Sequence, residues 1–198
     1  MQNKLPPNQH EIPELLKWNI DHPGIIPKNP IFDVKKWTLT VDGEVVNPFT
    51  LTWDDFLKLP SVELKSDFHC VEGWSVRNLV WWGVKFQSLI RIVKLKEAVK
   101  YVFFECYDGY TTSLDLDDLL EDNVLLAYKL NSEWLKIPLG GPLRLVIPKK
   151  YAYKSAMWLK RITFTQIKEL GYWEKKGYSD TADIWKNDRF VQEKRIND

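Results

Sequence analysis

Residues 67–75 read Asp-Phe-His-Cys-Val-Glu-Gly-Trp-Ser and overlap the end of an alternating polar and apolar segment, 61–68. Such alternation predicts a strand, which delivers His69 and Cys70 at its end. A cysteine there is often an inert buried residue. The alternatives are a nucleophile activated by His69 and a thiolate ligand for a soft metal. Because neighbouring side chains on a strand point to opposite faces, His69 is poorly placed to act as a base for Cys70.

The bulk composition is that of a soluble globular protein, with 44% hydrophobic and 28% charged residues in 198. We expect a single domain, 1–198, with an extended proline-rich N-terminal arm at about 1–35. A net charge of +1 gives no basic excess, so no nucleic-acid partner is expected. No apolar run resembles a secretory signal or a membrane segment, which predicts a cytoplasmic protein. Cys70 and Cys106 could form one disulfide, but thiols normally stay reduced in that compartment.

The order of predicted elements favours an α+β or mostly β architecture, because strands are many, helices are short and no βαβ alternation is present. Helices are expected at 53–59, where Thr52 can cap the first turn, at 86–92, and after Asp115 through Leu120. A further short helix is expected near 11–18. Strands are expected at 37–41, 49–51, 61–68, 101–106, 110–114, 124–130, 143–147 and 158–166.

Arg144 lies within the apolar segment 140–148, Gly-Gly-Pro-Leu-Arg-Leu-Val-Ile-Pro. An arginine in an apolar strand usually needs an anionic partner. The partner is either an Asp or Glu in a structural ion pair, or a bound anion such as phosphate, which suits the guanidinium fork.

Two loops carry polar groups that could approach an anion. Residues 149–156 combine lysines, tyrosines and Ser155, which is either an exposed loop or an anion-binding loop. The hydroxyl-rich turn 108–113 is by itself more often a hairpin than a site. Aromatic residues make 14% of the chain, which indicates either a dense aromatic core or a large flat ligand held between stacking walls.

Taken in order, these segments resemble the molybdopterin-binding oxidoreductase domain of the sulfite oxidase family, especially its small prokaryotic members related to the methionine sulfoxide reductase catalytic subunit. The stretches that carry the resemblance are 67–75, 82–84, 106–113, 140–145, 151–158, 171–174 and 177–178. It extends from about Pro6 to about Arg189. The order and spacing of these stretches are more specific than any one of them.

The resemblance implies an α+β fold with mixed sheets, barrel-like character and short helices. It implies one molybdenum, with tungsten as the alternative metal, carried by a single pterin dithiolene, with Cys70 as catalytic residue and metal ligand. The family's cofactor contacts fall on Cys106, Asp108, Arg144, Ser155, Ala156 and Met157, and on an N-terminal segment near 19–23 in which His22 is the preferred residue. Arg144 and Lys154 would meet the cofactor's phosphate.

Two departures from the family bear on the substrate. Relatives often have His five residues before the arginine and Lys before the tryptophan, where this chain has Leu139 and Met157. The expected function is two-electron oxygen-atom transfer on a small sulfite- or sulfoxide-like substrate, with an unidentified electron-transfer partner. Binding of sulfite, a dianion, would require more positive charge than this site retains. The alternative is a catalytically silent cofactor-binding or interaction domain on the same fold.

Overall fold

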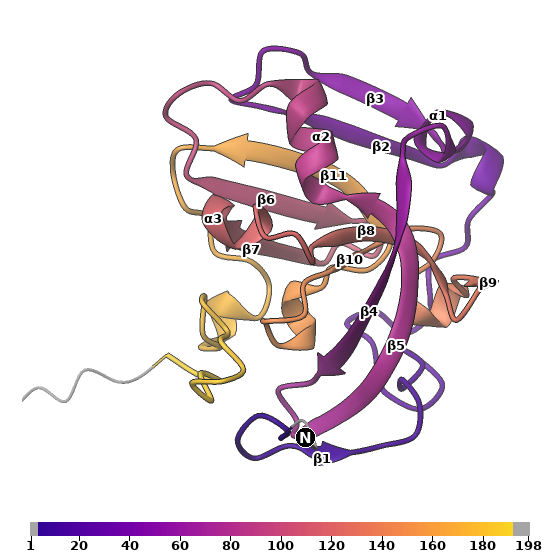
Figure 1. Cartoon of the computed structure of the whole chain (residues 1–198), viewed down its shortest axis with the longest axis vertical. Coiled ribbons are helices and arrows are strands. Elements are labelled where there is room, and N and C mark those ends of the chain that lie inside the picture. The colour runs from indigo at the N-terminus through magenta and orange to yellow at the C-terminus, as the bar shows by residue number, and fades with distance from the viewer. Residues whose placement is uncertain (1–3, 192–198) are drawn as a thin grey trace, which may run out of the picture.

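Eleven strands form two sheets in the computed structural model, which describes residues 4–191. The five-stranded sheet has the order β3-β2-β11-β6-β7, and β11 runs parallel to β2 but antiparallel to β6 (Figure 1). Its strands are β2 (Thr38–Gly43), β3 (Phe49–Thr52), β6 (Tyr101–Cys106), β7 (Thr111–Asp115) and β11 (Leu159–Thr165).

The six-stranded sheet is built around β5 (Trp74–Lys85), its longest strand. One edge of β5 pairs with β4 (Ser61–His69) along most of its length. The other edge pairs with β8 (Leu125–Leu130) near its end and with the short parallel strand β1 (His10–Glu11) at its start. Beyond β8 lie β10 (Arg144–Val146) and β9 (Glu133–Trp134).

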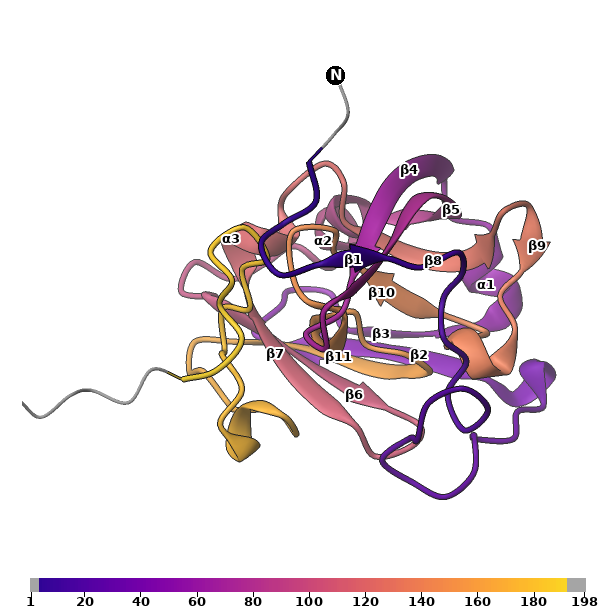
Figure 2. The same ribbon diagram turned by 90° about the horizontal axis from the view of Figure 1, so that it is seen from below.

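The β4–β5 hairpin is long enough to extend beyond the body of the two sheets, as Figure 1 shows. Its far end meets β1 and the N-terminal arm, which Figure 2 shows crossing beneath the hairpin. The turn that joins the two strands carries Cys70. The hairpin therefore holds this cysteine between the sheets and the terminal segments.

The main core lies between the two sheets, because side chains of both contribute to one buried cluster, among them Val41, Phe104 and Phe164 from one sheet and Val84 and Leu126 from the other. A second buried cluster covers the opposite face of the six-stranded sheet and includes Cys70, Trp81, Leu125 and Ala127. β8 alternates between the two clusters, as the two-residue period of a strand requires.

The helices are short and cover the ends of the sheets. They are α1 (Trp53–Leu57), α2 (Phe86–Val93) and α3 (Leu116–Leu119), with short 3-10 helices at Val34–Lys36, Ile137–Leu139, Ala152–Lys154 and Glu174–Lys176. Thr52 caps α1 as predicted, since its side chain accepts a hydrogen bond from the backbone N–H of Asp55 at 3.2 Å. Asp115 stands at the cap position of α3 but accepts from Lys168 Nζ at 3.1 Å instead.

The predicted α+β class, with mixed sheets and few short helices, is confirmed; within residues 4–191 both sheets stay open and form no closed barrel. The helix expected near 11–18 is wrong. The backbone N–H groups of His10 and Ile12 donate to Gly73 and Ser75 at 2.8 Å each, and this pairing with β5 replaces helical hydrogen bonds. Strand β5 was not predicted, because Arg77 and Asn78 interrupt its apolar pattern.

Gly83 lets β5 and β8 approach closely at an irregularity in their pairing. A Cβ added there would stand 2.1 Å from the carbonyl oxygen of Leu126 and 2.7 Å from Cα of Ala127. Both are backbone atoms that cannot swing away. The close contact of the two strands at this point therefore requires glycine.

Gly83→Ala should destabilise the fold by about 3 kcal/mol and lower the Tm by about 6–12 °C, because overpacking against backbone forces the strands apart. Gly177→Ala is the matched control: its φ is +92°, but no atom of residues 4–191 lies within 4 Å of the added Cβ. Only the backbone strain of about 1 kcal/mol is expected there. Thermal melts of the two variants test this, and equal losses would contradict it.

Candidate active site

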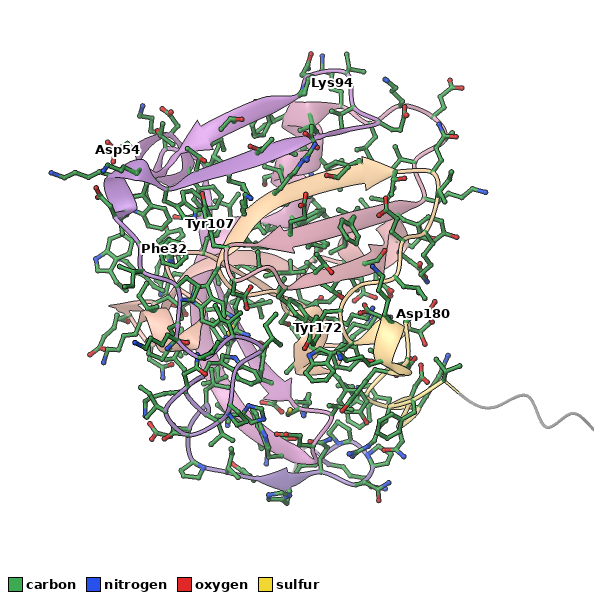
Figure 3. The ribbon with its side chains drawn as sticks, turned by 180° about the vertical axis from the view of Figure 1, so that it is seen from behind. Phe32, Asp54, Lys94, Tyr107, Tyr172 and Asp180 are labelled. Atoms are coloured by element: carbon green, nitrogen blue, oxygen red, sulfur yellow. The ribbon has the colours of Figure 1, made fainter. Side chains whose placement is uncertain are left out.

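A cavity of about 560 Å³ lies where the β4–β5 turn, the N-terminal arm, the loop after β10 and the segment after β11 meet. This volume is in the range of small-molecule and cofactor sites. Its walls are rich in aromatic side chains, contributed by Trp18, Phe68, Trp74, Tyr110, Tyr153, Trp158, Tyr172, Trp173 and Tyr178. Figure 3 labels Tyr172, which belongs to this lining. It also labels the packed pair Phe32 and Tyr107, whose ring centroids are 5.1 Å apart.

Cys70 lines this cavity from the tight turn between β4 and β5. The N–H of Cys70 donates to the carbonyl of Trp74 at 2.8 Å, and the N–H of Gly73 donates to the carbonyl of Cys70 at 3.1 Å. Gly73 has φ +102°, a conformation that favours glycine. The thiol is 7% exposed and forms no disulfide. Its sulfur is held by the backbone at the cavity wall.

Burial raises the pKa of the Cys70 thiol to about 12, so the thiol alone stays protonated at neutral pH. A bound cation is needed to make it a thiolate. Among residues 4–191, no cluster of three or more His, Cys, Asp or Glu side chains could hold a metal.

His69 points away from the cavity, as its place on the strand predicts. Its Nδ1 lies 2.7 Å from Oγ of Ser75, it is 4% exposed, and burial lowers its pKa. A Cys–His couple of the hydrolase type between Cys70 and His69 is therefore absent.

Arg144 reaches the cavity from β10 and is 4% exposed. Its Nη1 donates to the carbonyl of Leu139 at 2.8 Å, and its Nη2 donates to the carbonyl of Ser155 at 3.3 Å. Its Nε is buried without a hydrogen-bond partner. The guanidinium carbon lies 4.9 Å from the ring centroid of Phe68 and 5.5 Å from that of Trp81.

The charge of Arg144 has no carboxylate to compensate it among the described residues. Burial lowers its pKa from 12.5 to about 9, with no opposing charge. Because the pKa falls on folding, burying the charged form costs free energy at every pH below about 9. The structural ion pair considered for Arg144 is thus absent, and an anion in the cavity would offset this cost.

The loop after β10 supplies Ser155, Ala156 and Met157 to the cavity wall, as the resemblance implies. Ser155 Oγ accepts from the N–H of Ile147 at 3.2 Å, which holds the loop against β10. Gly140 makes room for Met157, since a Cβ on Gly140 would lie 2.7 Å from Cγ of that methionine.

Lys154 does not face the cavity, which corrects the expectation that it meets a phosphate there. It is completely buried, its Nζ donates to the carbonyl of Ser113 at 2.8 Å, and it forms an ion pair with Glu174. Glu174 Oε1 also accepts from Thr112 Oγ1 at 2.7 Å. Burial lowers the pKa of Lys154 although Glu174 opposes this. Lys154 joins the loop to the C-terminal segment, and of these two cations only Arg144 lines the cavity.

Cys106 is also outside the cavity lining, since its side chain is 4% exposed and belongs to the core between the sheets. Only its backbone could contact a cofactor. Asp108, two residues further, does line the cavity, and burial raises the pKa of its carboxyl. It accepts from the N–H of Tyr110 at 2.9 Å, which fixes the carboxylate at the turn between β6 and β7.

His22 lines the cavity and contacts Glu72, a residue to which the sequence assigned no role. His22 Nε2 lies 2.8 Å from Glu72 Oε1. Glu72 Oε2 accepts from Trp74 Nε1 at 3.2 Å and lies 3.8 Å from Sγ of Cys70. The position of Glu72 two residues after Cys70, on a tight turn, was the available signal. Leu139, in contrast, offers its carbonyl to Arg144 and does not line the cavity.

The cavity fits an anionic pterin that carries a metal. The unpartnered Nε of Arg144 offers a charged donor to an anion. The Asp108 carboxylate can accept N–H groups of a heterocycle, and the aromatic walls suit its flat faces. Cys70 can complete the coordination of a metal delivered by that carrier.

Comparison with known proteins agrees with this assignment. Residues 26–173 match the model of the oxidoreductase molybdopterin binding domain. An uncharacterized oxidoreductase of Bacillus subtilis (strain 168), YuiH, is 40% identical over 95% of this chain and 92% of its own length. The catalytic subunit MsrP of a protein-methionine-sulfoxide reductase from Campylobacter jejuni is 31% identical over 72% of this chain and 54% of its own length.

Among solved structures, the sulfane dehydrogenase SoxCD of Paracoccus pantotrophus shares the fold, with a TM-score of 0.67. The match covers 75% of this chain and 42% of that one, at 19% identity. Fold and cavity together thus define a molybdopterin-dependent oxidoreductase. The chain belongs to the molybdopterin-binding oxidoreductase family of the sulfite oxidase type, and its cofactor is molybdopterin.

Arg144→Met should stabilise the cofactor-free protein by about 1 kcal/mol or more, because it removes a buried charge without a counterion. The same change should lower the pterin bound after purification by about tenfold or more, since one charged hydrogen bond to an anion is lost. Pterin fluorescence and denaturant unfolding measure the two effects. Arg161→Met is the control, since that arginine pairs with Asp42 on the other sheet. A destabilised variant that keeps its pterin would contradict the assignment.

Glu174→Gln should destabilise the protein by about 3–5 kcal/mol, because it leaves the buried Lys154 ammonium without a counterion. The double variant Lys154→Met with Glu174→Leu removes both charges and should recover most of that loss. Urea unfolding of the double variant, of Lys154→Met alone and of Glu174→Leu alone gives the coupling free energy. Additive effects would show that the two side chains do not act as a buried pair.

Proposed function

We propose that this chain catalyses two-electron oxygen-atom transfer on a small neutral substrate of the sulfoxide type, with Cys70 as the protein ligand of the metal. The observation that supports the ligand role is the thiol of Cys70, held on a rigid turn at the wall of a cavity that also contains an uncompensated guanidinium. The bound molybdenum cofactor supplies the oxygen-atom exchange itself.

The protein's own residues have separate roles in this proposal. Cys70 fixes the metal, Arg144 binds the cofactor's anionic group, and Asp108 accepts N–H groups of the pterin. The backbone and hydroxyl of Ser155, with Ala156 and Met157, would form the wall next to that anion. The aromatic walls exclude water from the reacting centre.

The charge of the cavity supports a neutral substrate over sulfite. Glu72 and Asp108 bring two carboxyl groups to the lining, whereas Arg144 is its one arginine, and Lys154 is turned away toward Glu174. The anionic cofactor would use the charge of Arg144. A dianion would then meet Glu72 beside the metal ligand, and like charges at this distance repel.

The proposed reaction balances with an external electron donor. A sulfoxide takes up two electrons and two protons and yields a thioether and water. A redox partner must supply the electrons, and we propose a one-electron carrier for this role. MsrP, by its name, acts in a protein-methionine-sulfoxide reductase, and its likeness supports sulfoxides as the first substrates to test.

Cys70→Ser should abolish sulfoxide reduction while retaining most of the pterin, because the hydroxyl is a poor ligand for a soft metal centre and Arg144 is intact. The protein is produced in a host that makes the pterin, and its molybdenum, tungsten and pterin are measured. Methyl phenyl sulfoxide is then offered with reduced methyl viologen as electron donor. Wild-type turnover in Cys70→Ser would overturn the ligand role.

The substrate class is tested on the same wild-type sample by measuring the oxidation of sulfite, with ferricyanide as the electron acceptor. A kcat/KM for sulfite comparable to that for methyl phenyl sulfoxide would contradict the charge argument. A sample that contains the metal and pterin but converts neither compound would support the alternative function, a catalytically silent cofactor-binding domain.

A further inference from the structure

Arg189 lies near the end of the described chain and reaches back to the turn that carries Cys70. Its Nη1 donates to the carbonyl of Val71, the residue after the cysteine. Its Nη2 donates to the carbonyl of Asn8 in the N-terminal arm at 2.9 Å. Its Nε donates to Oδ1 of Asn187 at 2.9 Å. Each of the three guanidinium nitrogens therefore donates to a neutral oxygen acceptor.

The turn at Cys70 depends on this contact for one of its carbonyls. The carbonyl of Cys70 accepts from Gly73 and from Gln9 Nε2, the latter at 3.0 Å, but within residues 4–191 the carbonyl of Val71 accepts only from Arg189. Rotation of this carbonyl would change ψ of Val71 and φ of Glu72, inside the turn that the Cys70–Trp74 and Gly73–Cys70 hydrogen bonds close. A shift of this turn would displace the sulfur of Cys70.

Arg189 also contacts Tyr151, which directly precedes cavity-lining residues of the loop after β10. Its guanidinium carbon lies 5.4 Å from the ring centroid of Tyr151, which is completely buried. Tyr151 begins the loop that continues to Ser155 and Met157, and its Oη donates to Asn187 Oδ1 at 3.3 Å. The side chain of Arg189 thus connects the turn at Cys70 to residues 151–157, the cofactor loop.

We propose that Arg189 is a positioning residue that fixes the direction of the Cys70 sulfur by clamping the Val71 carbonyl to Asn8 and Tyr151. The proposal rests on the role of Cys70 as metal ligand. Three planar donors at fixed angles are needed for these contacts, which lysine cannot provide. Asn8 and Arg189 both lie outside the matched domain at 26–173, so the clamp comes from segments outside that match.

The test compares Arg189→Lys with Arg161→Lys, the same substitution at an arginine on the five-stranded sheet. In the cofactor-free protein, hydrogen exchange at the amides of Cys70 and Gly73 should rise about tenfold in Arg189→Lys only, as expected for the loss of one or two hydrogen bonds. This measurement requires no metal, so it tests the clamp separately from the proposed function.

In the cofactor-loaded protein, Arg189→Lys should change the g-values and broaden the EPR spectrum of partially reduced molybdenum, because these depend on the orientation of the ligating sulfur. Unchanged exchange at Cys70 and Gly73 would overturn the clamp. Increased exchange with an unchanged EPR spectrum would overturn its effect on the sulfur. A protein without metal would instead count against the proposed function.

A second variant keeps the test decisive if Arg189→Lys does not fold. Asn187→Gly removes the acceptor for Arg189 Nε but tolerates the φ of +52° at this position. It should show a smaller change of exchange and EPR in the same direction. Global unfolding of both variants would overturn the proposal, because it would give Arg189 a general structural role.

Discussion

Strand β5 is the element on which the rest of this structure depends, because three other strands pair with it. β4 occupies one edge, while β8 and β1 share the other edge at opposite ends. In this arrangement one end of β5 contributes side chains to the core between the sheets, and its other end contributes to the cavity wall. Gly83 permits the close approach to β8 at the core end, and the turn at Cys70 forms the cavity end. The cysteine of the site therefore follows directly from a strand pair that also contributes to the core.

Two buried cations show how context decides the role of a charge. Lys154 and Arg144 are both almost inaccessible to solvent, yet only Lys154 has a carboxylate partner, Glu174. Its charge is compensated within the protein and serves to hold the cofactor loop. Among the described residues, the charge of Arg144 has no carboxylate partner, and this side chain lines the cavity. A protein that keeps such a charge sacrifices stability at a functional site. Bound molybdopterin would be the compensating anion.

The cavity is assembled from segments far apart in the sequence, and this distributes its functions. The β4–β5 turn brings Cys70, the proposed metal ligand, and β10 brings Arg144, the proposed anion-binding residue. The N-terminal arm contributes Trp18 and His22, and the C-terminal segment contributes Tyr172 and Trp173. This chain spans about half of the length of MsrP but nearly the whole of YuiH. Differences in the terminal segments can therefore alter substrate access while the cofactor site at the centre of the family domain is retained.

The sequence alone determined the α+β class, eight of the eleven strands within residues 4–191 and the cofactor family, because strand alternation is local and the motifs around Cys70 and Arg144 keep their order. It could not show β5, in which Arg77 and Asn78 break the apolar pattern, nor the irregular arm. It also could not separate Lys154, which faces Glu174, from Arg144, which faces the cavity. Which carboxylate lies beside which cation depends on strand register and on contacts between distant segments. Only the tertiary structure decides this, since the free energy of a buried charge depends on its neighbours in space.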